Sequence, residues 1–225
     1  MRLHFTKVTL LFARLALFAH RPHSRKDMIQ AVWPDVHPDE GRQRLRQAIC
    51  SLKQRLSDLP PPHTSDSLFS DREYLSLHTD LISTDVGEFE ALLQSSKSSE
   101  ETQKIQSLSK AISLYKGPLL QGFDEEWVNL ERERLEQICM SAILELIDLY
   151  RKQNNLTEAL KYAFRAVELD PLYETAQFAL IRLLADSGNS KSARRQYRRY
   201  SRRLRENMQL SPSQDLRKFV SSLPL

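Results

Sequence analysis

The chain has 225 residues, 40% hydrophobic and 28% charged, with only five glycines, a composition typical of a helix-rich globular protein with room for two domains. Its two cysteines have no C-x-x-C spacing and fall on separate predicted helices, which argues against a disulfide framework or a zinc site and favours a reducing cytoplasm. No apolar stretch reaches the roughly 18 residues that a membrane span needs, so we expect no membrane partner.

The net charge of +4 is distributed unevenly along the chain. Residues 1–60 hold 11 Lys/Arg against 5 Asp/Glu, residues 61–190 hold 12 against 22, and residues 191–225 hold 10 against 2. A basic front beside an acidic body predicts that the front binds a polyanion and that the body binds something else.

Two helices are predicted within the first 33 residues. Residues 6–19 are helix-periodic and apolar on nearly all sides, and the break at Arg21-Pro22-His23 ends this first helix. Ser24 is placed to cap a second, short helix, with Asp27 at its third position, and this helix stops before Pro34. Its expected buried side chains are Met28, Ile29, Val32 and Trp33.

Residues 39–58 form the third predicted helix, which begins at His37-Pro38. Its apolar residues are spaced four, three and four apart and make one narrow stripe, consisting of Leu45, Ile49, Leu52 and Leu56. At about 100° per residue, the opposite side carries arginine and glutamine, the side chains that pair with guanine and adenine edges in a major groove. This side is either a groove-reading face or an ordinary solvated face, and the neighbouring elements favour the first.

A β-hairpin is predicted after the third helix. The proline-rich residues 60–67 cannot be helical and form a loop, and residues 68–77 then flank the turn Ser70-Asp71-Arg72-Glu73. Three helices followed by a hairpin is the order of a winged helix-turn-helix, in which the last helix enters the major groove and the wing approaches the backbone or the minor groove. Arg72 is then either the cationic tip of the wing or a plain turn residue.

The front of the chain also resembles the DNA-binding region of bacterial activators of the Streptomyces antibiotic regulatory protein type. The resemblance rests on His23-Ser24-Arg25, on Trp33-Pro34-Asp35 and on the run from Leu45 to Lys53, LRQAICSLK. The chain departs from the family's pattern at Cys50-Ser51-Leu52-Lys53, which has one arginine fewer and a lysine in place of another. The family also has a small sheet before the first helix, whereas only Met1–Phe5 precede it here.

Residues 84–225 are almost entirely helix-periodic and repeat at an offset of 34 residues. The offset relates Ala142 to Ala176, Asn155 to Asn189, Ala159 to Ala193, Ala163 to Tyr197 and Ala166 to Tyr200. Leu169-Asp170-Pro171 places a proline where a tetratricopeptide helix pair turns over, and small alanines at these offsets allow two helices to approach closely. We expect roughly three helix pairs and a final capping helix near residues 213–223.

This half resembles the bacterial transcriptional activator domain that follows the winged helix in the same family. The matching segments are, in chain order, residues 84–90 (TDVGEFE), 114–123 (LYKGPLLQGF), 127–128 (WV), 131–135 (ERERL) and 168–174 (ELDPLYE). The two resemblances together imply a DNA-bound activator whose helical half mediates dimerisation or contacts RNA polymerase. We expect Trp127 to lie in the core, where it closes the loop of residues 117–123.

Two further features leave alternatives open. An apolar stripe from Ala193 to Leu204 leaves the remaining helix faces to the arginines of residues 194–205. These arginines are either solvated or paired with the acidic middle of the chain, or they contact phosphates. Cys50 lies on the predicted groove face as either a redox-sensitive thiol or a small neutral filler, and Cys139 is expected in the core. The sequence has no phosphate-binding glycine loop and no metal-ligand motif, so we expect no cofactor and no enzyme activity.

These observations predict a mainly α-helical protein. A winged helix-turn-helix, with its N-terminal sheet in question, takes residues 1–83, and a tetratricopeptide-like activator domain takes residues 84–225. We expect a cytoplasmic, homodimeric transcriptional activator that reads double-stranded DNA with residues 39–57 and contacts RNA polymerase. Base edges are assigned to Gln43, Arg46, Gln47 and Ser51, and phosphates to Arg42, Arg44, Lys53 and Arg72.

Two competing hypotheses remain. In the first, the chain is a protein–protein adaptor whose helical repeat binds a peptide and whose winged domain no longer binds DNA. In the second, it is the front piece of a larger regulator that has been separated from an ATPase half.

Overall fold

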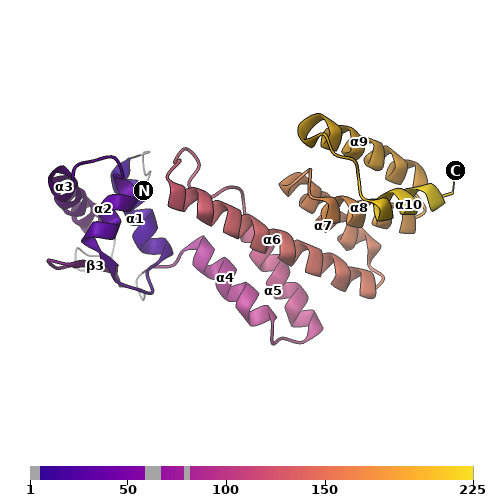
Figure 1. Ribbon diagram of the computed structural model, residues 1–225. Helices are drawn as coiled ribbons and strands as arrows, with labels where there is room; N and C mark the ends of the chain where they lie inside the picture. Colours follow the sequence, from indigo (N-terminus) through magenta and orange to yellow (C-terminus); the bar gives the residue numbers. More distant parts are fainter. Residues whose placement is uncertain (1–5, 59–66, 79–81, 225) are drawn as a thin grey trace. The chain divides into compact units, whose positions relative to one another are not determined.

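The computed structural model describes residues 6–58, 67–78 and 82–224, which fold into two compact units (Figure 1). The N-terminal unit comprises the residues up to 91 together with residues 114–133. The C-terminal unit comprises residues 92–113 and 134–225. The short stretch Met1–Phe5 and the expected loop over residues 60–66 lie outside the described residues.

Three helices begin the N-terminal unit, as the sequence predicts: α1 (Lys7–Leu17), α2 (Arg25–Val32) and α3 (Pro38–Ser57). The side chain of Ser24 caps α2 by accepting a hydrogen bond from the backbone N–H of Asp27 at 3.0 Å. Pro38 occupies the first turn of α3, where a missing N–H costs nothing. The predicted starts of both helices are therefore confirmed.

A three-stranded antiparallel sheet completes this part of the unit, with strand order β1-β3-β2. The expected hairpin is formed by β2 (Leu68–Ser70) and β3 (Tyr74–Leu77). The third strand, β1 (His23–Ser24), pairs His23 with Leu75, and it lies where the sequence predicts only a break between helices. Two residues are too few to show the alternation that identifies a strand in a sequence.

The core of the N-terminal unit draws on residues from both of its chain segments. Helices α1, α2 and α3 and the hairpin bury a set of mainly leucine side chains, including Leu11, Leu45 and Leu75, each 0% exposed. Phe123 and Val128 belong to the same buried cluster, at 9% and 0% exposed. The apolar surface of the winged-helix elements is therefore covered in part by a segment that follows them much later in the chain.

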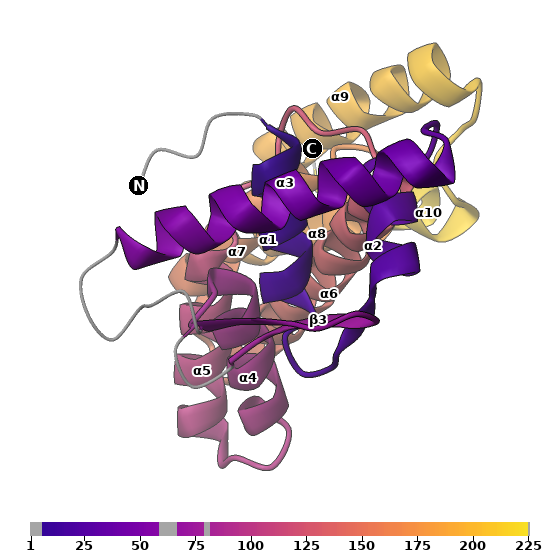
Figure 2. The ribbon, with the colours of Figure 1, turned by 90° about the vertical axis from the view of Figure 1, so that its left-hand side faces the viewer.

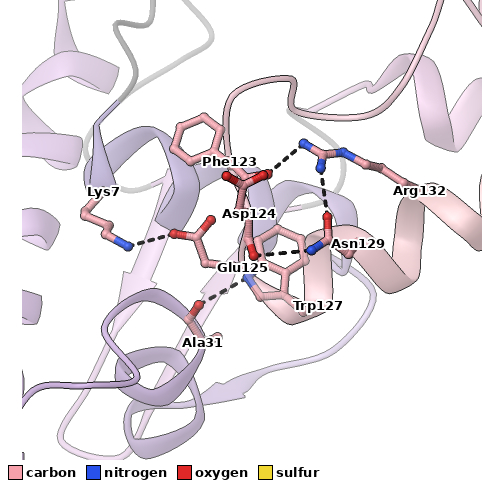
Figure 3. Close-up of polar contacts among 8 residues, drawn as sticks. All are labelled: Lys7, Ala31, Phe123, Asp124, Glu125, Trp127, Asn129 and Arg132. Atoms are coloured by element: carbon pink, nitrogen blue, oxygen red, sulfur yellow. Dashed lines mark hydrogen bonds and ion pairs between the residues drawn. The ribbon is translucent and has the colours of Figure 1, made fainter.

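Polar contacts fix this later segment to α1 and α2 (Figure 3). The ammonium group of Lys7 lies 2.7 Å from a carboxylate oxygen of Glu125, and the indole Nε1 of Trp127 donates to the carbonyl oxygen of Ala31 at 3.2 Å. The guanidinium of Arg14 lies 4.9 Å from the centre of the Trp127 ring. The indole of Trp127 thus packs on α1 and α2 and is only partly buried, whereas the sequence predicts that it lies in the core.

Arg132 fixes the backbone of that loop. Its guanidinium donates hydrogen bonds to the carbonyl oxygens of Leu119 and Leu120 at 2.6 and 2.5 Å. It also donates to the carbonyl oxygen of Phe123 at 2.7 Å, as Figure 3 shows. Leu120 has a φ of 48°, which a leucine seldom adopts. A guanidinium with five donors can satisfy several carbonyls at once, so one side chain holds this turn in a conformation that its own residues do not favour.

In the described residues after the hairpin there are seven helices: α4 (Asp85–Ser96), α5 (Glu101–Leu114), α6 (Glu126–Lys152), α7 (Leu156–Leu169), α8 (Glu174–Asp186), α9 (Ser190–Met208) and α10 (Gln214–Ser222). Three successive pairs and a final short helix are present in the described residues, as the helical periodicity predicts. Along this series, α7 packs on α8, α8 on α9 and α9 on α10. None of the helices in the described ranges is both long and apolar enough to cross a bilayer.

The 34-residue offset in the sequence corresponds to a physical repeat. Asn155 and Asn189 cap α7 and α9 in the same way, each by accepting a hydrogen bond from the backbone N–H three residues ahead, at 3.2 and 3.1 Å. The residues before them, Asn154 and Gly188, both have positive φ, 55° and 79°. Glycine and asparagine are the residues that tolerate this conformation at a helix end.

The alanines of the repeat are buried where consecutive helices meet. Ala142, Ala159, Ala176 and Ala193 are each at most 4% exposed. Cys139 on α6 is also fully buried, and burial raises the pKa of its thiol to about 11. It is a core residue, as expected.

Candidate nucleic-acid interface

The apolar stripe of α3 is packed into the N-terminal unit. Leu45, Ile49, Leu52 and Leu56 are each at most 7% exposed. Figure 2 shows α3 running across the front of α1 and α2. A Cβ atom at Gly41 would lie 2.5 Å from Cγ2 of Ile29, so only glycine allows the first turn of α3 to approach α2 this closely.

The opposite side of α3 is exposed to solvent. Of the eight residues assigned to DNA from the sequence, Arg42, Gln43, Arg44, Arg46, Gln47 and Arg72 are exposed, and Ser51 and Lys53 are partly buried. The thiol-bearing Cys50 is exposed on the same helix. The packed and polar sides of the helix thus fall where its periodicity predicts.

Two of the arginines on α3 form ion pairs with the first turn of the same helix. Arg42 pairs with Asp39, and the Nη2 atom of Arg44 lies 2.6 Å from Oε1 of Glu40. All four side chains are about half exposed or more, and such pairs contribute only about 0.2–1 kcal/mol. A phosphate could therefore replace either carboxylate at little cost, although the carboxylates lower the positive potential at this end of the helix.

Backbone hydrogen bonds hold the wing tip in a fixed turn. The carboxylate of Asp71 accepts from the backbone N–H groups of Glu73 and Tyr74, both at 2.7 Å. These hydrogen bonds to Tyr74 and Glu73 hold the pKa of Asp71 below its usual range, so the carboxylate stays ionised and the turn stays closed near neutral pH. The turn places Arg72 at the exposed tip.

A groove of about 710 Å³ lies between α2, α3 and the wing. Its basic lining residues are Arg25, Lys26, Arg42, Arg46 and Arg72, and its one acidic lining residue is Asp71. Its floor is apolar and includes Trp33, Val36 and Leu45. Guanidinium groups around a concave surface on a helix and a wing are suited to a polyanion that fills the concavity.

The groove brings together some of the predicted residues and not others. Arg42, Arg46 and Arg72 line it together, although Arg72 is distant from the other two in sequence. Gln43, Arg44, Gln47, Ser51 and Lys53 do not line it and occupy other positions along α3. The predicted set is thus divided between the groove and the rest of the helix surface.

Comparison with known proteins identifies the family. Residues 84–223 match the family described as the bacterial transcriptional activator domain. The chain belongs to this family. Its membership confirms the resemblance seen in the motifs of the second half of the sequence. The family is one of transcriptional regulators and not of enzymes.

The fold also resembles that of a solved structure. The chain is similar in structure to Mycobacterium tuberculosis EmbR, which was solved in complex with a low-affinity phosphopeptide, with a TM-score of 0.74 and 20% sequence identity. The likeness covers 97% of this chain and 60% of the EmbR chain, so this chain spans less than two thirds of the length of that chain. No curated protein matches the chain. The winged N-terminal part and the helical repeat are both confirmed as fold assignments.

In this activator-domain protein, the groove also contains residues that sequence reasoning missed. Arg25 on α2 donates from Nε to the carbonyl oxygen of Asp71 at 2.8 Å and from Nη2 to Oγ of Ser70 at 2.9 Å. Its own backbone N–H donates to the carbonyl oxygen of Glu73 at 2.8 Å. Arg25 therefore fastens the wing to α2 and sets the width of the groove. The only signal in the sequence was its place in the His23-Ser24-Arg25 motif.

Lys26 and Gln30 are the other polar lining residues that the sequence did not single out. Both are exposed on α2, one turn apart. They are polar residues on a short amphipathic helix, and nothing in the sequence separates them from an ordinary solvated face.

Proposed function

We propose that the chain is a DNA-binding transcriptional activator whose helix α3 reads a site in the major groove. The observation that carries the proposal is the basic groove in which Arg42 and Arg46 of α3 meet Arg72 of the wing. The packed apolar stripe behind α3 supports it, because a recognition helix must be held firmly from one side. Membership of the bacterial transcriptional activator domain family supplies the biological context.

The roles assigned to individual side chains follow from their chemistry and exposure. Arg46 is the main candidate for a base contact, because among the described residues no hydrogen bond or ion pair engages its guanidinium, and arginine pairs bidentately with guanine. We assign base edges also to Gln43, Gln47 and Ser51. Phosphates are assigned to Arg42, Arg44, Lys53 and Arg72, which fix the position of the protein without reading sequence.

The helical repeat is proposed to serve self-association or a contact with RNA polymerase. Doubling a DNA-binding module raises affinity for repeated half-sites, so a homodimer would suit this architecture. A regulator of this kind would act in the cytoplasm. Sedimentation of the free chain, and of the chain mixed with RNA polymerase, tests each association directly.

Selection of binding sites from a random duplex library, followed by titration of the selected duplex, tests the DNA-reading proposal. We expect Arg46→Ala to weaken binding to the selected site by about 1–3 kcal/mol and to relax the sequence preference at one position. Arg217→Ala on α10 is the matched control, because it removes one exposed positive charge from a different helix.

Arg44 provides a second, different readout. Arg44→Ala should weaken all sequences to a similar extent and lower the salt slope by about 1. Glu40→Gln should do the opposite, since it removes the carboxylate that pairs with Arg44. If no library sequence is selected and binding of random duplex is absent, the protein–protein adaptor is the better assignment.

A further inference from the structure

The helix α9 carries a row of arginines on the side that faces away from the rest of the C-terminal unit. The row, here called the arginine face, consists of Arg195, Arg198, Arg199, Arg202 and Arg205, all of them exposed. At about 100° per residue these five side chains lie within an arc of about 120°. Figure 1 shows α9 as an outer helix of its unit, beside α8 and α10.

The opposite side of α9 is fully engaged within the C-terminal unit. Ala193, Tyr200 and Leu204 are at most 5% exposed. The hydroxyl of Tyr200 donates to a carboxylate oxygen of Glu174 at 3.1 Å, and Gln196 donates to Oε1 of Gln177 at 2.8 Å. These contacts fix the rotation of the helix, so the arginine face is a permanent surface of the unit.

No partner for the arginine face is present within the described part of the chain. Arg194, at the edge of the face, is used internally and donates to the carbonyl oxygen of Leu223. In contrast, no carboxylate among the described residues lies within ion-pair distance of the five arginines of the face. Pairing with the acidic middle of the chain, one of the alternatives that the sequence leaves open, is therefore absent from this surface. The exposed Glu206 lies on the same side of α9, so the face keeps an excess of four positive charges.

The chemistry of the face indicates which kind of partner fits it. All five cations are guanidinium groups, whose forked donors match phosphate oxygens bidentately. The face has no exposed aromatic or aliphatic side chain among its arginines, and such side chains normally anchor a protein–protein interface. A second copy of the same face is excluded as its partner, because two such rows would repel each other.

The length of the face is also suited to a nucleic-acid backbone. Ten residues of helix separate Arg195 from Arg205, which is about 15 Å at 1.5 Å per residue. On B-DNA, that length corresponds to about four phosphates of one strand, spaced at about 3.4 Å along the axis.

We propose that the arginine face of α9 is a second DNA-contacting surface that binds the phosphate backbone without reading sequence. It rests on the proposed function only for the choice of duplex DNA as the polyanion. Its contribution is to affinity and to the rate of association, whereas sequence preference belongs to α3.

The test compares two charge-matched variants of the full chain on a mixed-sequence duplex. The first variant replaces the five arginines of the face with glutamine. The second replaces five exposed cations elsewhere: Lys97, Lys116, Lys152, Lys161 and Lys218. Both remove five positive charges, and circular dichroism checks that both retain the parent's helix content and unfolding transition. Binding is measured by fluorescence anisotropy between about 50 and 200 mM salt.

We expect the arginine-face variant to bind the duplex at least about 10-fold more weakly at the lowest salt concentration, with a salt slope smaller by about 2–4. The charge-matched control should retain the parent slope within about 1. Equal slopes for the parent and the arginine-face variant would overturn the proposal. So would unchanged duplex binding combined with a loss of binding to polyglutamate, since that result assigns the face to an acidic protein.

Failure of this proposal can be distinguished from failure of the proposed function. Arg46→Ala acts on the preference for a selected site, whereas the arginine-face variant acts on random duplex. If Arg46→Ala loses the sequence preference and the arginine-face variant binds random duplex like the parent, only the proposal for the arginine face is overturned. If the arginine-face variant has a lowered salt slope and the library yields no selected site for the parent, only the sequence-reading role of α3 is overturned.

Discussion

The two units of this protein reach a packed core by different routes. In the C-terminal unit, each helix from α7 to α10 packs on the next one in the chain, and the caps and buried alanines recur after 34 residues. In the N-terminal unit, Lys7 contacts Glu125 across 118 positions of chain, and Phe123 completes a core begun by α1. Contacts between neighbouring helices let each helix of the repeat stabilise the next. The core of the N-terminal unit depends instead on a segment far away in the chain.

The sharpest test of this difference is to cut the chain. A fragment ending at residue 90 loses Phe123, Val128 and Trp127, and burial of such side chains contributes about 1.5–3 kcal/mol each. Because small domains have only about 5–15 kcal/mol of stability, we expect this fragment to lack a cooperative thermal transition. A fragment of residues 92–225, which keeps both chain segments of the C-terminal unit, should retain one. Circular dichroism melts of both decide the point, and a cooperative melt of the first fragment would contradict it.

A single core substitution tests the same dependence within the intact chain. Phe123→Ala should lower the free energy of unfolding by about 3–5 kcal/mol, since it leaves a cavity in the buried cluster of the N-terminal unit. Phe164→Ala is the control, because that ring is 48% exposed in the C-terminal unit, and it should cost about 0.5 kcal/mol or less. Urea denaturation measures both changes, and equal losses would show that the later segment does not contribute to the N-terminal core.

The close approach of α3 to α2 gives a smaller effect. Gly41→Ala places a methyl group against Ile29 and should cost about 1–3 kcal/mol of overpacking, offset by about 1 kcal/mol of helix propensity. We expect a net loss of roughly 1 kcal/mol and weaker DNA binding, because α3 must shift to make room. Gln43→Ala on the exposed side of α3 is the stability control. A more stable Gly41→Ala protein would show that the approach is not tight.

The repeat predicts equal effects at equivalent positions. Asn155→Ala and Asn189→Ala should each lower the free energy of unfolding by about 1 kcal/mol, because each removes a cap of the same geometry. Asn207→Ala is a suitable comparison, since its side chain donates to a helix carbonyl and caps no helix start. Clearly unequal losses at positions 155 and 189 would argue against treating the two helix pairs as copies.

The smallest expected effect is a pH dependence of the N-terminal unit. Burial lowers the pKa of His23, whose Nε2 lies 3.1 Å from the carbonyl oxygen of Phe18 and whose neighbours Arg21, Arg14 and His20 disfavour a further positive charge. The unfolded chain then binds more protons, so stability falls as the pH drops below the unfolded value of about 6.5. His23→Gln should flatten this dependence between about pH 7 and 5, and His78→Gln, at an exposed site, should not.

The sequence was most informative where a residue acts on its near neighbours. The cap at Ser24, the turn at Asp71 and the stripe of α3 depend on residues a few positions apart, and all were visible as patterns. Asn155 was visible only as a position that recurs at Asn189, and its role as a cap came from the structure. The strand at His23 and the docking of the loop before α6 depend on partners far away in the chain, which no local pattern encodes. The groove lies between these cases, since α3 and the wing tip were predicted and its wall at Arg25 was not.

The restraint at Arg25 has a consequence for how basic residues at this surface should be interpreted. Its guanidinium already donates hydrogen bonds to Asp71 and Ser70 of the hairpin. Replacing Arg25 with alanine would remove both hydrogen bonds, so the hairpin would be held less firmly against α2. An alanine scan would record that loss as weakened DNA binding and would count Arg25 among the ligands of the nucleic acid. Arg25→Lys separates a structural role from a DNA contact. Lysine retains the positive charge but cannot make both hydrogen bonds of the guanidinium, so the wing is held less firmly.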